Sequence, residues 1–163
     1  LGRLGHLLRV SLDTERQQTV SLAQEVDHVS DYLGIEAVRF RDRLSVTYSV
    51  PADLGELMVP SMILQPLAEN AIKHGLDRIN DAVHISVIAT QDDGILILNV
   101  VDNGPGCDDI GQALSHGGIG LRNVRERLRT LYGDRAAMDV QQPPGGGFHV
   151  AISLPVEQAP EHP

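Results

Sequence analysis

The feature of this sequence that most constrains its fold is an apolar run that ends in a carboxylate and two glycines. Residues 95–101, "ILILNVV", carry the apolar and β-branched side chains typical of a buried strand. Asp102 follows at once, and "NGPG" (103–106) then breaks the chain into a sharp turn. Taken alone, this motif is compatible with an ordinary turn, or with a strand that carries a carboxylate into a binding site.

The rest of the chain alternates helical and strand patterns. Apolar residues recur at helical spacing over 22–40, and residues 1–12 look like the end of another amphipathic helix. A further helix is predicted from about Pro60 to Gly75, where Gly75 is a C-cap and Pro66 argues for a kink. The last helix, 120–133, is closed by Gly133.

Strands are predicted wherever apolar and polar residues alternate or β-prone residues cluster, and these segments are 43–50, 83–90, 95–101, 137–141 and 149–154. "DDG" between the second and third strands predicts a hairpin turn. A glycine-containing loop fills about 104–118. This order predicts an α/β fold: a two-layer sandwich with one mixed sheet and helices on one face.

Composition excludes several classes of function. The formal net charge of −9 argues against nucleic acid binding, which needs a basic face, and two Phe, three Tyr and no Trp offer few stacking platforms. No apolar stretch reaches the ~18–20 residues that a membrane helix needs. One cysteine excludes an internal disulfide. Because the chain begins at Leu1 and not at methionine, we interpret it as part of a longer protein.

Three polar residues of the helix ending at Gly75 share one side of it. Asn70, Lys73 and His74 have i, i+3, i+4 spacing, so their side chains can meet. An amide oxygen can ligate Mg²⁺ and an ammonium can contact phosphate. The alternative is a solvated helix face with a Glu69–Lys73 ion pair.

Glycines precede the last helix at positions 117, 118 and 120. They offer either a flexible entry to the helix, or free backbone N–H groups for a phosphate at its N-terminus. No Gly-Lys-Ser/Thr follows, so this is not a P-loop, and no dinucleotide-binding glycine motif follows a strand.

The order of these motifs resembles the GHKL family of ATP-binding proteins. "ENAIKHG" (69–75) resembles its N box, "DNGPG" (102–106) its first glycine box, "GGIGL" (117–121) its second and "GGGF" (145–148) approximately its third. "YLGIEAVRF", "LQPLAENAIKHG" and "GIGLRNVRERLRTLYG" are similar to the LytS/YehU class of bacterial sensor histidine kinases. The resemblance covers about residues 7–155 and implies the Bergerat fold.

The resemblance implies ATP and Mg²⁺ as ligands and assigns the residues that bind them. Asp102 would accept a hydrogen bond from the adenine amine, and Asn70 would ligate Mg²⁺. Glu69 would orient a nucleophile or water. The other implied nucleotide-binding residues are Lys73, His74, Asn103, Gly104, Gly106, Gly118, Ile119, Gly120, Leu121 and Gly147. Phe148 departs from the family, which has a threonine hydroxyl there to support the aspartate.

The implied function is a two-component sensor histidine kinase that transfers the γ-phosphate of ATP to a histidine. None of the seven histidines has the family's phosphoacceptor neighbours, so we expect that histidine upstream of this chain, which would not phosphorylate itself. Residues 1–42 would be the end of the dimerisation and phosphoacceptor region, 43–156 the ATP-binding catalytic domain and 157–163 a disordered tail.

Other expectations concern the whole protein. It would form a homodimer, pass its phosphate to a response regulator and bind no nucleic acid. Its catalytic domain would be cytoplasmic, and the full-length protein would be anchored in the bacterial inner membrane. The alternatives are an ATP-gated conformational clamp of the chaperone, topoisomerase or mismatch-repair type, and a serine kinase that acts on an anti-sigma partner.

Overall fold

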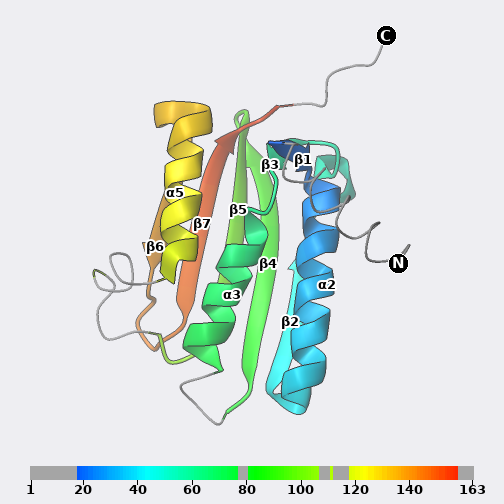
Figure 1. Ribbon diagram of the computed structural model, residues 1–163, viewed down its shortest axis with the longest axis vertical. Coiled ribbons are helices and arrows are strands. Elements are labelled where there is room, and N and C mark those ends of the chain that lie inside the picture. The colour runs from blue at the N-terminus through cyan, green and yellow to red at the C-terminus, as the bar shows by residue number, and fades with distance from the viewer. Residues whose placement is uncertain (1–17, 77–80, 107–110, 112–117, 158–163) are drawn as a thin grey trace, which may run out of the picture.

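Three long helices cover one face of a five-stranded sheet in the computed structural model (Figure 1). The structure describes residues 18–76, 81–106, 111 and 118–157. The helices are α2 (Leu22–Phe40), α3 (Leu64–Gly75) and α5 (Gly118–Tyr132). The predicted helix over 1–12 and most of the glycine loop, with Cys107 and Gly117, lie outside the described residues. The predicted two-layer α/β arrangement is confirmed.

The large sheet has the strand order β2-β4-β5-β7-β6. Its strands are β2 (Leu44–Ser49), β4 (Val83–Asp92), β5 (Ile95–Asp102), β6 (Ala137–Gln141) and β7 (Phe148–Pro155). β2 runs parallel to β4 and every other pairing is antiparallel, so the sheet is mixed as predicted. In the hairpin between β4 and β5, Asp93 (φ 43°) and Gly94 (φ 75°) both have positive φ, which a type I′ turn requires.

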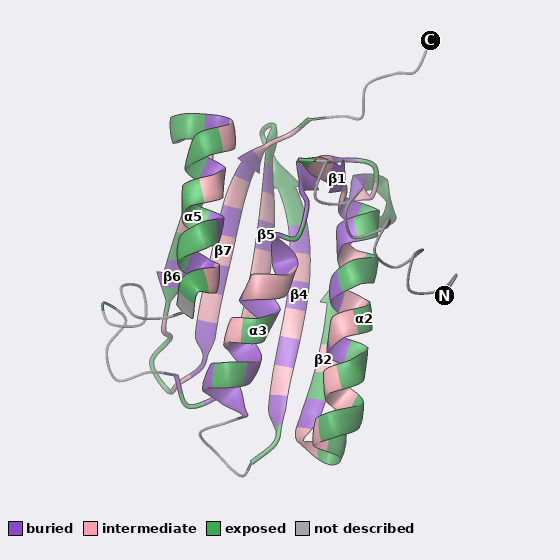
Figure 2. Cartoon of the chain, viewed as in Figure 1, coloured by how far each residue is buried: buried purple, intermediate pink, exposed green. Residues whose placement is uncertain are grey.

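Alternating burial fixes which face of the sheet the helices cover. On β5, Leu96, Leu98 and Val100 are buried while their neighbours are more exposed, and β7 alternates in the same way. Figure 2 shows this alternation as bands along the strands beneath the helices. From the other layer, α2 contributes Leu22 and Leu33 to the same core. The strand bearing Asp102 is therefore anchored by its own inward side chains.

A second, two-stranded sheet corrects two predictions. β1 (Thr19–Ser21) pairs antiparallel with β3 (Met58–Pro60), so the chain has more than one sheet. The helix predicted from Pro60 begins only at Leu64, because Pro60 belongs to β3. Strands of three residues carry too little alternation to be recognised in a sequence. Short 3₁₀ turns complete the described elements: η1 (Arg41–Arg43), η2 (Ala52–Leu54) and η3 (Gly133–Arg135).

Pro66 and Gly75 of α3 also differ from the prediction. Pro66 lies in the first turn, where a missing N–H breaks no intrahelical hydrogen bond. Gly75 is not the C-cap, because the helix ends on Leu76 with φ −83°. A Cβ on Gly75 would lie 2.9 Å from Val83 Cγ1, so the position is small because the sheet comes close. Gly133 (φ 59°) does follow α5 in the left-handed conformation.

The C-terminal segment is tied to the small sheet at its start. The predicted tail begins at Glu157, whose carbonyl oxygen accepts a hydrogen bond of 2.8 Å from the Met58 N–H. Residues 158–163 lie outside the described residues.

Candidate nucleotide-binding site

A pocket lies between α3 and the start of α5. Its lining combines polar residues of α3 with small and apolar residues of both helices: Pro66, Glu69, Asn70, Lys73, His74, Gly120 and Leu121. Six of these seven are predicted site residues, and Pro66 is the exception. The structure thus brings the N box and the second glycine box together.

The polar side of α3 supplies two groups that the protein leaves uncommitted. The Asn70 Nδ2 atom is buried and has no hydrogen-bond partner among the described residues. Lys73 is exposed at the pocket. Glu69 accepts a hydrogen bond of 2.9 Å from Gln65 Nε2, and across the described chain it makes no ion pair with Lys73. The alternative of a Glu69–Lys73 pair is therefore wrong.

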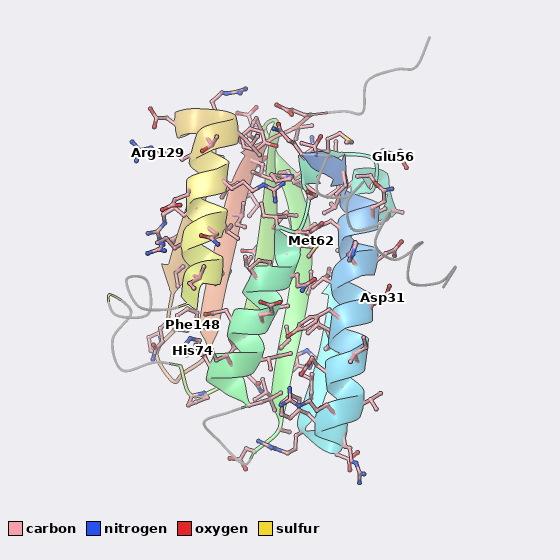
Figure 3. The ribbon with its side chains drawn as sticks, viewed as in Figure 1. Asp31, Glu56, Met62, His74, Arg129 and Phe148 are labelled. Atoms are coloured by element: carbon pink, nitrogen blue, oxygen red, sulfur yellow. The ribbon has the colours of Figure 1, made fainter. Side chains whose placement is uncertain are left out.

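His74 is buried at the inner wall of the pocket and not at its rim. Its side chain is stacked on Phe148, with ring centroids 5.6 Å apart and planes inclined by 10° (Figure 3). Phe148 is fully buried and is the first residue of β7. The position where the family has a threonine hydroxyl therefore carries an aromatic ring, which joins the N-box helix to the end of the sheet.

Asp102 lies next to Phe148 in the β5–β7 pairing, at the end of β5. It is 4% exposed. Its Oδ1 accepts a hydrogen bond of 2.9 Å from the Gly104 N–H, while Oδ2 is buried with no partner in the described parts of the chain. Burial raises the pKa of this carboxyl from 3.8 to about 6, although the backbone amides of Gly104 and Phe148 oppose the rise. When Asp102 is ionised, its Oδ2 is available to accept a hydrogen bond from a ligand.

Two glycine turns meet around Asp102 with no room for side chains. A Cβ on Gly104 would lie 2.7 Å from Gly75 Cα and 2.9 Å from Asp102 Oδ1. Gly147 (φ 88°) donates a hydrogen bond of 2.6 Å to the Gly104 carbonyl, and a Cβ there would collide with the Asp102 carbonyl oxygen. Gly106 also has positive φ, 75°. Glycine is required because backbone packs directly on backbone here.

The structure does not bring every predicted residue into the pocket. Its lining does not include Asp102, Asn103, Gly104, Gly106, Ile119 or Gly147. Asn103 Oδ1 accepts a hydrogen bond of 2.6 Å from the His84 N–H, and this pair extends the β4–β5 ladder. Ile119 is 72% exposed and does not line the pocket. Gly118 is the first residue of α5, and Gly120 comes close to Pro66 of α3.

Two charged residues that the sequence analysis did not single out hold α3 at its ends. Glu25 of α2 accepts hydrogen bonds at the start of α3, and Arg43 of η1 donates one at its end. A signal for Glu25 was present, because it lies three residues after Leu22 and four before Val29 on the apolar stripe of α2. A charge on such a stripe indicates a buried partner.

Family models match nearly the whole chain. Residues 58–158 match the model described as "Histidine kinase-, DNA gyrase B-, and HSP90-like ATPase", and residues 1–44 match one described as "Histidine kinase".

Known proteins of similar sequence carry the names of sensor kinases. "Sensor histidine kinase YesM" of Bacillus subtilis is 33% identical over 153 residues, which cover 93% of this chain and 26% of that protein. "Sensor protein LytS" of Staphylococcus haemolyticus is 37% identical over 147 residues, covering 85% of this chain and 25% of that protein. The chain thus spans about a quarter of the length of these curated relatives.

Solved structures share the fold at lower identity. "Mycobacterial sensor histidine kinase MprB" aligns with a TM-score of 0.63 and 18% identity, over 86% of this chain and 99% of that one.

Proposed function

This chain belongs to the family of histidine kinase-, DNA gyrase B- and HSP90-like ATPases, and we propose that it is the ATP-binding catalytic domain of a two-component sensor histidine kinase. The single observation that carries the proposal is the buried Asp102 carboxylate with an unpartnered oxygen at the end of β5. A buried polar atom without a partner is costly, so proteins retain one chiefly where function needs it.

Asp102 Oδ2 supports adenine as the base that is bound. A carboxylate oxygen accepts hydrogen bonds, and the exocyclic amine of adenine donates them. Guanine has a carbonyl at the equivalent position, which would set acceptor against acceptor. The glycine turns formed by Gly104 and Gly147 pack directly around Asp102 and hold it in place. The Phe148 amide lowers the pKa of the carboxyl, and the Phe148 side chain has no hydroxyl to offer it.

The polar side of α3 fits the phosphates and their cation. We assign Asn70 as the Mg²⁺ ligand through its amide oxygen, the type of atom that Mg²⁺ prefers. Its buried amide nitrogen has no partner within the described protein and can donate to a phosphate oxygen. When bound, Mg²⁺ neutralises charge on the phosphate oxygens. Lys73 adds an exposed positive charge at the same pocket, and His74 lies beside it against Phe148. Gly120 of α5 lies close to Pro66 of α3 and forms part of the opposite wall.

The reaction is phosphoryl transfer from ATP to an imidazole nitrogen outside this chain. A nitrogen–phosphorus bond forms, the bond from the γ-phosphorus to the bridging oxygen breaks, and ADP leaves. Positioning and charge stabilisation supply most of the rate in such reactions. We assign Glu69, which is exposed beside Asn70, the role of orienting the incoming nucleophile.

Partners and location follow from the same proposal. Residues 1–42 are the end of the dimerisation and phosphoacceptor region, and residues 43–156 form the catalytic domain. The whole protein is a homodimer that passes its phosphate to a response regulator from the cytoplasmic side of the inner membrane. Across the described residues, no helix is both long and apolar enough to cross a membrane.

The test is to mix this chain with labelled ATP, Mg²⁺ and a separate histidine-bearing dimerisation segment from a related kinase. We expect acid-labile phosphate on the added segment, none on this chain alone, and none when Asn70→Ala replaces the native chain. Acid-stable phosphate on a serine would indicate an anti-sigma type kinase, and ATP-driven dimer closure without transfer would indicate a clamp. Label on a histidine of this chain would overturn the upstream location of the phosphoacceptor.

A further inference from the structure

α2 lies alongside α3 and runs in the same direction, so both helices begin at one end of the molecule and end at the other (Figure 1). Two parallel helices place their positive N-terminal poles together and their negative C-terminal poles together. At each end, one charged side chain of opposite sign stabilises the helix pole. Both side chains come from α2 or from the η1 turn directly after it.

Glu25 serves the N-terminal poles of both helices. It lies in the first turn of α2 and is 2% exposed. Its Oε1 accepts a hydrogen bond of 2.8 Å from the Leu64 N–H, and its Oε2 accepts one of 2.9 Å from the Met62 N–H. The N-cap of α3 is Ile63, which has no side-chain acceptor. A residue 39 positions earlier in the chain therefore caps the helix that carries Asn70.

Arg43 serves the opposite end. Its Nη2 donates a hydrogen bond of 3.0 Å to the carbonyl of Leu76, the C-cap of α3. A guanidinium at the last carbonyls of a helix stabilises the negative pole. Glu25 and Arg43 together hold α3 along its axis, one at each end, as a clamp of fixed length.

The entry to α3 is strained, and the clamp holds it in its strained conformation. Met62 has φ 58°, a left-handed conformation that a non-glycine side chain adopts at a cost. Glu25 holds the Met62 N–H in that conformation. From α5, Arg127 reaches the neighbouring Ser61 and donates to its carbonyl oxygen and to its Oγ, the latter at 3.0 Å. Residues 61 and 62 are thus hydrogen-bonded to both α2 and α5. They connect the two helices that line the pocket, α3 and α5, at the strained entry to α3.

We propose that Glu25 and Arg43 are positioning residues that set the axial position of α3, and so transmit the position of α2 to Asn70, Lys73 and His74. This inference rests on the proposed nucleotide site. Asn70 lies six residues after Leu64, about 9 Å along the helix at ~1.5 Å per residue. A displacement of the α3 cap therefore displaces the phosphate-binding side chains. The adenine-reading Asp102 lies on the sheet and is not held by Glu25.

The experiment compares ATP·Mg²⁺ binding with adenosine binding by titration calorimetry on the whole chain. Glu25→Ala should weaken ATP·Mg²⁺ about tenfold, within the range for loss of a helix N-cap, and change adenosine less than twofold. Glu25→Gln keeps one acceptor and should lie between. Asp31→Asn, an exposed acidic residue of the same helix (Figure 3), is the matched control and should change neither.

A rescue variant separates positioning from general destabilisation. Glycine adopts the φ of residue 62 without strain, so Met62→Gly added to Glu25→Ala should recover part of the ATP·Mg²⁺ affinity. Equal loss of ATP·Mg²⁺ and adenosine affinity in Glu25→Ala, or no loss of either, would overturn the clamp.

Amide hydrogen exchange, measured by NMR without nucleotide, judges the clamp independently of the site. Exchange of the Met62 and Leu64 amides should rise about tenfold in Glu25→Ala and stay unchanged in Asp31→Asn. Unchanged exchange in Glu25→Ala would refute the clamp even if nucleotide binds. Failure of the native chain to bind ATP·Mg²⁺, with the exchange result as expected, would refute the proposed function and leave the helix clamp standing as a structural device alone.

Discussion

Replacing Asp102 by asparagine should stabilise the nucleotide-free chain at neutral pH. The carboxyl is buried with Oδ2 unpartnered, and its pKa is raised from 3.8 to about 6. That rise corresponds to about 3 kcal/mol, at ~1.4 kcal/mol per pKa unit, by which ionised Asp102 weakens folding. In asparagine the oxygen still accepts from Gly104, while the unpartnered amide nitrogen retains about 1 kcal/mol of the cost. We expect a net gain of about 2 kcal/mol.

The sign of the pH dependence follows from the same pKa. Because the folded carboxyl binds its proton more tightly than the unfolded one, folding takes up a proton between pH 3.8 and about 6. The free energy of unfolding of the native chain should therefore fall as the pH rises through that window, and level off above it. The advantage of Asp102→Asn should be full at pH 7.5 and shrink towards pH 4.

Urea unfolding followed by far-UV circular dichroism is the suitable assay, because the chain has no tryptophan to report by fluorescence. Asp31→Asn is the control and should change stability by no more than about 0.5 kcal/mol. A less stable Asp102→Asn chain at pH 7.5 would refute the reasoning. It would mean that the carboxylate serves the Gly104 turn and is not held for a ligand.

Three further predictions concern the same site. Asn70→Ala should abolish the tightening of ATP binding by Mg²⁺ and leave adenosine affinity within about twofold; an equal fall for both ligands would make Asn70 structural. Gly147→Ala should lower the free energy of unfolding by at least about 2 kcal/mol, because its Cβ meets the Asp102 carbonyl, whereas Gly133→Ala, with open space around it, should cost only about 1 kcal/mol in urea unfolding. Adenosine affinity should rise from pH 5 through the Asp102 pKa of about 6 and level off about one pH unit above it, since only ionised Asp102 offers both oxygens as acceptors. Asp102→Asn should show no such change in calorimetry.

Patterns within one segment of the sequence predicted the helices and strands that depend only on that segment. The bounds of α2, Leu22–Phe40, match the prediction because an apolar residue every three or four positions needs no distant partner to be seen. β3 was missed because only its pairing with β1 makes Met58–Pro60 a strand. Gly75 was assigned to a C-cap because helices often end on glycine. In the structure it packs closely against Val83 of β4 and against Gly104 in the turn after β5.

The candidate site also has features that the sequence predicted and features that only the structure shows. The spacing of Asn70, Lys73 and His74 is local, and the structure places all three at one pocket. The stacking of His74 on Phe148 joins residues that are 74 positions apart, so no local pattern contains it. Glu25 could be placed on the buried face of α2 from the sequence, but the backbone amides that it caps could not be identified. The stacking of His74 and the capping by Glu25 both depend on contacts between distant segments. A sequence pattern can identify one residue of such a contact but not its partner.

The most direct test of the account is to titrate ATP and GTP, each with Mg²⁺, into the native chain. An amine that pairs with the buried Asp102 Oδ2 contributes about 1–3 kcal/mol relative to a carbonyl that leaves it unpaired. We therefore predict that ATP binds about five- to 140-fold more tightly than GTP, at ~1.4 kcal/mol for each factor of ten. Equal affinities for the two nucleotides, or binding of neither, would contradict the assignment of Asp102 and of the pocket beside it.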